Sequence, residues 1–369
     1  MTKKLIGLID ADLLDNGTRH PNIALEKISA YQKYELKNDT RLLLTYNEIN
    51  SCDEVYISKV YTYTKVPPIR KPKNTKVFKG GTGFYREKAF DDDRRLKYDI
   101  EHYKPDYELY NDFIKKELAR KIKPIKYRDY KDYSIGFATR GCFRKCQFCV
   151  NRRFDKVKRW APISEFLDND RKYIYLWDDN VLGLKDGWRQ VFYELEETGK
   201  RFQFRQGLDI RLMDEEKAKV ITSSRYIGDF IFAFDHLKER DLIDKKLKIW
   251  KKHCTKTTKL YLLCAYESTD AKDIEGIFKR IEVLMSYRCL PYIMRFEGWQ
   301  NSEFKGMYIN LARWCNQPDF FKKKSFREYC EANGEKSSTM KYLRLFEKKH
   351  PAIAKRYFDL RYDQAPILF

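Results

Sequence analysis

The first hundred residues alternate short apolar runs with amphipathic segments. Three of these runs have the length of strands and span residues 5–9, 42–45 and 55–60, and a short apolar pair at 77–78 runs into the glycine-rich turn at 80–83. Pro21 opens an amphipathic stretch that predicts a helix, with one apolar face made by Ala24, Leu25, Ile28 and Tyr31. Regular alternation of strand and helix predicts a small parallel sheet with helices on both faces.

A second alternating series begins at Tyr133. Its six apolar runs are typical of strands and span residues 135–138, 173–177, 201–204, 230–234, 260–265 and 291–296. Helical patterns separate these runs, for example at residues 214–222 and 273–287. Six such units are fewer than the eight of a closed β/α barrel, so the series predicts a partial (β/α)6 barrel.

The two series predict an α/β protein in four parts. A doubly wound, Rossmann-like domain covers residues 1–110, and a linker helix covers residues 111–130. The partial barrel covers residues 131–300, and a basic helical region covers residues 301–369. With 369 residues, the chain is long enough for several domains with their own cores.

Net charge adds an expectation about partners. The formal charge at pH 7 is +21, and 15% of the residues are aromatic. Tyr and Phe alternate with basic runs such as 152–153, 156–159 and 322–324, a combination that can follow phosphates and stack on bases. A nucleic acid or nucleotide partner is therefore predicted. The alternative is an A/T-rich genome that favours Lys, Tyr and Phe codons.

The chain shows no sign of a membrane or secreted location. No window of about 18 uncharged apolar residues is present, which argues against a membrane span. The N-terminal apolar run meets an acid at Asp10, too early for a signal peptide. Nine cysteines without a paired framework suit a reducing compartment, so a cytoplasmic location is predicted.

Three cysteines carry the most specific chemistry. Cys142, Cys146 and Cys149 lie in the run Gly-Cys-Phe-Arg-Lys-Cys-Gln-Phe-Cys, directly after a predicted strand. Three thiolates can hold three corners of a [4Fe–4S] cube and leave the fourth iron open. The alternatives are structural zinc, which usually takes four ligands, and three buried free thiols. The other six cysteines are scattered and are predicted to be buried thiols: Cys52, Cys254, Cys264, Cys289, Cys315 and Cys330.

The Cys-x3-Cys-x2-Cys spacing resembles that of the radical S-adenosylmethionine (SAM) superfamily. The resemblance implies that SAM chelates the open iron and is cleaved by one electron to a 5′-deoxyadenosyl radical. It also implies that residues 131–300 form the radical SAM core. Phe148 stands where the superfamily places an aromatic residue beside the adenine.

The N-terminal sheet resembles the cobalamin-binding-type domain that precedes the core in one branch of the superfamily. Nearly the whole chain resembles uncharacterised phage and bacterial radical SAM proteins, through shared runs at 10–12, 80–84, 206–211 and 310–315. Cobalamin-using domains typically carry Asp-x-His-x-x-Gly. That run is absent here, since His20 lies in Gly-Thr-Arg-His-Pro, and its absence argues against cobalamin.

Polar residues follow several predicted barrel strands. Because strand ends face the active side of a β/α barrel, these residues are candidates to bind SAM or substrate: Asp178, Asp179, Asn180, Arg205, Gln206 and Glu267. The first three could hold the SAM ammonium group or ribose, and Arg205 could pair with its carboxylate. The alternatives are helix caps and ordinary ion pairs. His236 is expected to be a structural histidine.

Together these observations predict a radical SAM enzyme that modifies a nucleic acid or nucleotide. It would need a reductase or a flavodoxin-type protein as electron donor. Two alternatives stay open: a cobalamin-dependent radical SAM methyltransferase, and a non-catalytic nucleic-acid-binding module stabilised by zinc.

Overall fold

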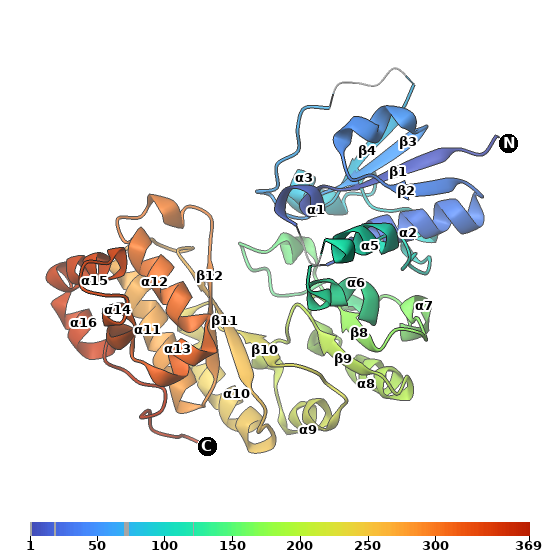
Figure 1. Cartoon of the computed structure of the whole chain (residues 1–369). Helices are drawn as coiled ribbons and strands as arrows, with labels where there is room; N and C mark the ends of the chain where they lie inside the picture. Colours follow the sequence, from blue (N-terminus) through green and yellow to red (C-terminus); the bar gives the residue numbers. More distant parts are fainter. Residues whose placement is uncertain (1, 18–19, 70–73, 121) are drawn as a thin grey trace. The chain divides into compact units, whose positions relative to one another are not determined.

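The computed structural model describes residues 2–17, 20–69, 74–120 and 122–369 (Figure 1). The chain divides into two compact units, Met1–Gln203 and Phe204–Phe369. The finer division into four parts stays a prediction. Each unit is described by itself.

A four-stranded parallel sheet forms the N-terminal part of the first unit. Its strand order is β2-β1-β3-β4, and each neighbouring pair is parallel. The strands are β1 (Leu5–Asp10), β2 (Asp39–Leu42), β3 (Glu54–Ser58) and β4 (Lys76–Gly80). Alternate β1 residues face two separate cores, with Ile6 and Leu8 in one and Ile9 in the other. The predicted doubly wound sheet is therefore confirmed.

Helices surround this sheet. They are α1 (Ala11–Asn16), α2 (Ile23–Ala30), α3 (Thr82–Tyr85), α4 (Tyr98–Glu101), α5 (Asn111–Ala119) and α6 (Arg128–Asp132). The predicted helix near Pro21 is α2. It begins after Asn22, whose side-chain oxygen accepts the Leu25 N–H at 3.3 Å and so caps the first turn.

The second predicted strand is displaced from its apolar run. The run at 42–45 is mostly loop, and β2 lies at Asp39–Leu42. As an edge strand, β2 exposes Asp39 and Arg41, so hydrophobicity does not mark it. Leu43 lies just beyond the strand, fully buried, and donates its N–H to the Leu8 carbonyl at 2.8 Å.

The first unit also contains the beginning of the predicted barrel series. Its three-stranded sheet has the order β5-β8-β9, with β5 (Tyr133–Gly136), β8 (Tyr173–Leu176) and β9 (Arg201–Phe204). A short antiparallel pair, β6 (Thr139–Arg140) and β7 (Lys158–Arg159), follows β5. Two helices belong to this part, α7 (Ile163–Phe166) and α8 (Trp188–Glu197).

The second unit continues the series with a parallel sheet of order β10-β11-β12. Its strands are β10 (Phe230–Ala233), β11 (Thr258–Cys264) and β12 (Leu290–Arg295). Three helices accompany the strands, α9 (Glu215–Ser223), α10 (Arg240–His253) and α11 (Ala271–Ser286). All six predicted strands of the series are present.

The C-terminal region is helical, as predicted. Its helices are α12 (Lys305–Cys315), α13 (Pro318–Lys323), α14 (Phe326–Glu331), α15 (Ser338–Lys349) and α16 (Pro351–Tyr357). Trp314 of α12 is fully buried among aromatic side chains, including Phe321 and Phe326. Over the part of the chain that the structure describes, no helix has the length and apolar character of a membrane span.

Candidate functional site

The three motif cysteines lie in the loop that joins β6 to β7. Gly141 enters the loop with φ of 92°, and a Cβ there would stand 2.5 Å from the Lys156 carbonyl oxygen. Only glycine tolerates both the backbone conformation and this close approach. The chain then passes Cys142 and Cys146, and Cys149 precedes the 3₁₀ turn Val150–Arg153.

Nitrogen donors approach the thiol groups. Cys142 Sγ accepts the Arg144 backbone N–H and the Asn180 side-chain amide, both at 3.5 Å. Cys149 Sγ accepts the Asn151 N–H at 3.4 Å. Such N–H···S contacts stabilise negative charge on sulfur, which is the form that binds iron.

The thiols also influence one another. Burial, together with the neighbouring Cys146 and Cys142, raises the pKa of Cys149 to about 11. A bound iron would compensate the charge of the Cys149 thiolate, which burial otherwise disfavours.

The donor set suits a cube held by three cysteines. In a [4Fe–4S] cluster each thiolate bonds a different iron, so the sulfurs do not converge on one point. Within the described residues, no group of three His, Cys, Asp or Glu side chains is arranged around a single metal ion. Cys142, Cys146 and Cys149 would hold three irons of the cube.

Asp178 fixes the chain just before this loop. Its carboxylate accepts the Ala138 N–H at 3.1 Å, and the Thr139 N–H and hydroxyl, both at 2.6 Å. It is 1% exposed, and burial raises its pKa to about 7. These bonds hold the chain between β5 and β6 against the end of β8. The predicted contact of Asp178 with SAM would compete with them.

Asp179 and Asn180 hold the cysteine loop itself. Asp179 Oδ2 accepts the Gly141 N–H at 2.7 Å, and its Oδ1 accepts the Asn151 side-chain amide at 2.7 Å. Asn180 donates to Cys142 Sγ. The end of β8 therefore positions both sides of the loop. The sequence places these residues at a strand end but does not reveal these bonds. Their contacts with SAM stay predictions.

The remaining predicted SAM contacts lie in different parts of the chain. Phe148 is half-buried within the cysteine loop. Arg205 and Gln206 directly follow β9, near the start of the second unit, and Gln206 is exposed. Glu267 follows β11 and accepts His236 Nδ1 at 2.8 Å, so His236 has the structural partner expected of it. The roles of these residues toward SAM stay predictions.

The six other cysteines are buried, as predicted, and form no disulfide. Burial raises the pKa of Cys264, Cys289 and Cys330 to about 12. Neutral, inaccessible thiols of this kind act as small apolar side chains.

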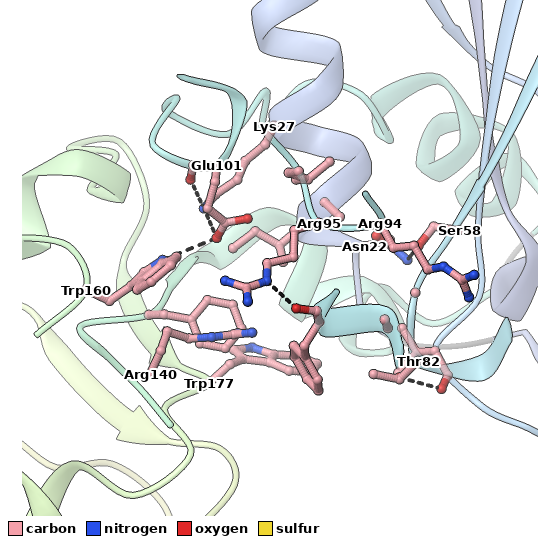
Figure 2. Close-up of a pocket in the computed structure, with 18 of the residues that line it drawn as sticks. Asn22, Lys27, Ser58, Thr82, Arg94, Arg95, Glu101, Arg140, Trp160 and Trp177 are labelled. Carbon is pink, nitrogen blue, oxygen red and sulfur yellow. Dashed lines mark hydrogen bonds and ion pairs between the residues drawn. The ribbon is translucent and has the colours of Figure 1, made fainter. Parts of the chain in front are cut away.

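A cavity of about 590 Å³ lies within the first unit. One wall comes from the carboxyl ends of the N-terminal strands, with Asp10, Ser58 and Gly81. The other walls come from residues 89–102 and from the barrel part, which contributes five side chains: Phe137, Arg140, Phe154, Trp160 and Trp177. Figure 2 shows Arg95, Arg140, Trp160 and Trp177 around the same space. Sequence reasoning missed this cavity, although two runs that line it, 10–12 and 80–84, had been singled out.

Buried acids in the N-terminal wall are already bonded. Asp10 accepts the Tyr110 hydroxyl at 2.9 Å, and burial raises its pKa to about 7. Asp12 accepts the Val60 N–H at 2.7 Å and the Thr64 hydroxyl at 2.5 Å. These acids hold the loops after β1 and β3.

Fold and loop together define an α/β protein that carries three cysteines in the loop between β6 and β7. No protein-family model matches the sequence, and no curated protein matches it. Among solved structures, the chain is similar to the radical S-adenosylmethionine methyltransferase TsrM from Kitasatospora setae, whose structure contains cobalamin and a [4Fe–4S] cluster. The match covers 80% of this chain and 72% of TsrM, with a TM-score of 0.53 and 10% identity. This likeness shows the fold and confirms the predicted fold class.

Proposed function

We propose that this chain is a radical SAM enzyme whose cluster is held by Cys142, Cys146 and Cys149. The observation that carries the proposal is the way the end of β8 fixes the cysteine loop through Asp179 and Asn180. When bound, the cluster would supply the electron that cleaves the C5′–S bond of SAM to methionine and a 5′-deoxyadenosyl radical, which takes a hydrogen atom from substrate.

The chain's own residues would place the reactants. Asp179 and Asn180 would hold the loop that SAM approaches, and Phe148 would lie against the adenine. Arg205, Gln206 and Glu267, at strand ends, would bind SAM or substrate polar groups. Precise placement matters because the reacting atoms must be held within a few ångströms and away from water. A reductase or flavodoxin-type protein would supply the electron that reduces the cluster.

A nucleic acid or nucleotide is the proposed substrate class. Its support is the net charge of +21 together with the high aromatic content. Modification of a C–H bond on a base or ribose would be the outcome.

A cobalamin-dependent methyltransferase is the second candidate. It is favoured by the fold shared with TsrM, which binds cobalamin, and by the cavity at the strand ends of the N-terminal sheet. Against this candidate, the chain lacks the Asp-x-His-x-x-Gly run typical of cobalamin-using domains. His20 lines the cavity but lies in Gly-Thr-Arg-His-Pro instead.

Anaerobic reconstitution tests the main proposal. The wild type should bind about four irons and form 5′-deoxyadenosine from SAM with a chemical reductant. Cys146→Ala should lose the cluster absorption and SAM cleavage together, whereas Cys52→Ala, a buried cysteine outside the motif, should keep both. A Cys146→Ala protein with full iron content would refute the assignment, and zinc in place of iron would favour the non-catalytic module.

A further inference from the structure

The cavity in the first unit contains a row of aromatic rings, Tyr98, His102 and Trp160, called here the aromatic ladder. The Tyr98 and His102 ring centroids are 4.3 Å apart, and those of His102 and Trp160 are 5.3 Å apart. The interplanar angles are 39° and 34°, so each ring is tilted against its neighbour. Tyr98 is 74% exposed at one end of the ladder, so one of its faces can receive another flat ring.

Ion pairs and hydrogen bonds hold the inner rings in place. Trp160 donates its indole N–H to Glu101 at 3.3 Å, and Glu101 pairs with Lys27 at 3.1 Å (Figure 2). His102 Nδ1 lies 3.1 Å from Glu165. A ligand that stacks here meets rings that are already ordered, which lowers the entropic cost of binding.

Arg140 provides a cation on the barrel side of the cavity. Its guanidinium lies 4.0 Å from the Phe137 ring centroid, and no carboxylate of the described residues pairs with it. By contrast, Arg95 pairs with Asp92 at 3.3 Å. A half-buried, unpaired guanidinium in a cavity favours an anionic group that it can bind in a bidentate way.

The acids that line the cavity do not cancel this charge. Glu101 is paired with Lys27, and Asp12 accepts bonds from Val60 and Thr64 in the loop after β3. Asp10 is bonded to Tyr110, and its pKa of about 7 leaves it partly neutral. Among the residues that line the cavity, five Lys and Arg side chains stand against four Asp and Glu.

Trp177 adds an unused donor to the lining. Its indole nitrogen is buried, and none of the described residues accepts its N–H. Buried donors normally have partners, so this one calls for a water or a ligand acceptor in the cavity. Trp177 directly precedes Asp178, and Arg140 directly precedes Gly141, so both border the cysteine loop.

We propose that the cavity binds a nucleoside monophosphate unit, either free or as one residue of a single-stranded polynucleotide. Its base stacks on the aromatic ladder, its phosphate pairs with Arg140, and Trp177 donates to one of its oxygens. This proposal rests on the proposed function, for which it assigns the place of substrate binding. A flat ring joined to a phosphate is the chemistry that fits the ladder and the cation together.

Binding by the full-length, anaerobically reconstituted protein tests the proposal. Uridine monophosphate and a single-stranded tetranucleotide are titrated separately in the presence of saturating SAM, so that the adenosine site of SAM is filled. Tryptophan fluorescence and calorimetry report affinity. Arg140→Gln and Tyr98→Ala should each weaken binding about tenfold. Two matched controls should bind as the wild type does: Arg120→Gln, whose side chain is 75% exposed and lies outside the cavity lining, and Tyr34→Ala.

The two ligands distinguish a free nucleotide from a residue of a polynucleotide as the natural ligand. Tighter binding of the mononucleotide supports a free nucleotide, and tighter binding of the tetranucleotide supports a polynucleotide residue. The proposal is overturned if neither ligand binds, or if both cavity variants bind like the controls. It is also overturned if cobalamin binding depends on these residues and nucleotides do not compete. Iron content and 5′-deoxyadenosine formation are measured in parallel, so a failed cavity proposal is distinguishable from a failed radical SAM assignment.

Discussion

Asp179 links the end of β8 to both sides of the cysteine loop, through Gly141 and Asn151. Removal of its carboxylate leaves the Gly141 N–H without its acceptor, at a position where only glycine fits. The loop then loses an anchor, although all three cysteines remain.

Asp179→Ala should therefore make the cluster labile and weaken SAM binding by about 1–3 kcal/mol.

Phe148→Ala should weaken SAM binding by a similar amount, because one aromatic contact is lost, but should leave iron content unchanged. Iron release to a chelator and SAM titration measure the two effects. Asp170→Ala, an exposed acid in the same unit, is the control. Wild-type behaviour of Asp179→Ala in both assays would show that the loop does not depend on β8.

Glu26 shows a different use of a buried acid. It lies in α2, 1% exposed, and its Oε2 has no hydrogen-bond partner among the described residues. Burial raises its pKa to about 8, against an ordinary value of 4.5. The folded state therefore holds a proton that the unfolded chain releases above pH 4.5.

The sign of the pH dependence follows from linkage. A raised folded-state pKa contributes stability that is complete below the unfolded pKa and is lost as pH rises through the folded one, here from about 4.5 to about 8. Between these two pH values, the free energy of unfolding should fall by at most about 1.4 kcal/mol for each pH unit. Glu26→Gln should remove this pH dependence. Urea unfolding at pH 6 and pH 9 should show a larger loss of stability for the wild type than for the variant. Equal losses would mean that Glu26 is ionised in the folded protein.

For single residues, the sequence predicts which residues form the site better than it predicts the hydrogen bonds between them. The cysteine spacing and the acids after β8 are visible as patterns of residue type. The bonds from Asp179 to Gly141 and Asn151 depend on β8 lying beside β5 in one register, which no local pattern encodes.

Among the elements, β5 carries the tightest constraint near the site. A Cβ on Gly136 would stand 2.2 Å from the Phe166 ring of α7, so the helix packs directly on the strand backbone. Because β5 leads into the cysteine loop, this contact also sets where the loop begins.

Gly136→Ala should destabilise the protein by about 1–3 kcal/mol through overpacking. Phe166→Leu should relieve the clash, so the double variant should be less destabilised than the sum of the single changes. Gly276→Ala in α11 is the opposite control, since its nearest neighbour, Leu237, is 4.0 Å away. That change should add about 0.5–1 kcal/mol of stability. Thermal unfolding measures all four proteins, and additive effects at Gly136 and Phe166 would contradict the packing argument.

Element prediction succeeds where burial and pattern coincide. The strand predicted at 201–204 is β9, with the same bounds. The strand predicted at 42–45 lies instead at Asp39–Leu42, because an edge strand needs no apolar side chains on its exposed face. The cavity was missed for a further reason. Its walls come from segments more than a hundred residues apart, such as those of Asp10 and Trp177.

At the scale of the whole molecule, the excess of 75 Lys and Arg over 54 Asp and Glu has two explanations. Either the charge serves a polyanionic substrate, or it reflects codon use with solvated lysines. Many surface cations have a nearby acid, as Lys323 does with Asp319 at 3.9 Å, but such exposed pairs are weak and leave the net charge intact.

Lys322, Lys323 and Lys324 at the end of α13 offer a direct test. If they contact a polyanion, their joint change to Gln should lower the log–log salt slope of single-stranded nucleic acid binding by roughly 2, since each neutralised phosphate contributes about 0.7. SAM cleavage without substrate should stay unchanged. A matched triple change of Lys115, Lys131 and Lys172, all exposed in the first unit, should leave the slope near the wild-type value. Binding measured across a range of salt concentrations decides the matter. Equal slopes for the two triple variants would show that α13 makes no special phosphate contacts. Weak binding by all three proteins would favour the codon-use explanation and a peptide or small metabolite as substrate.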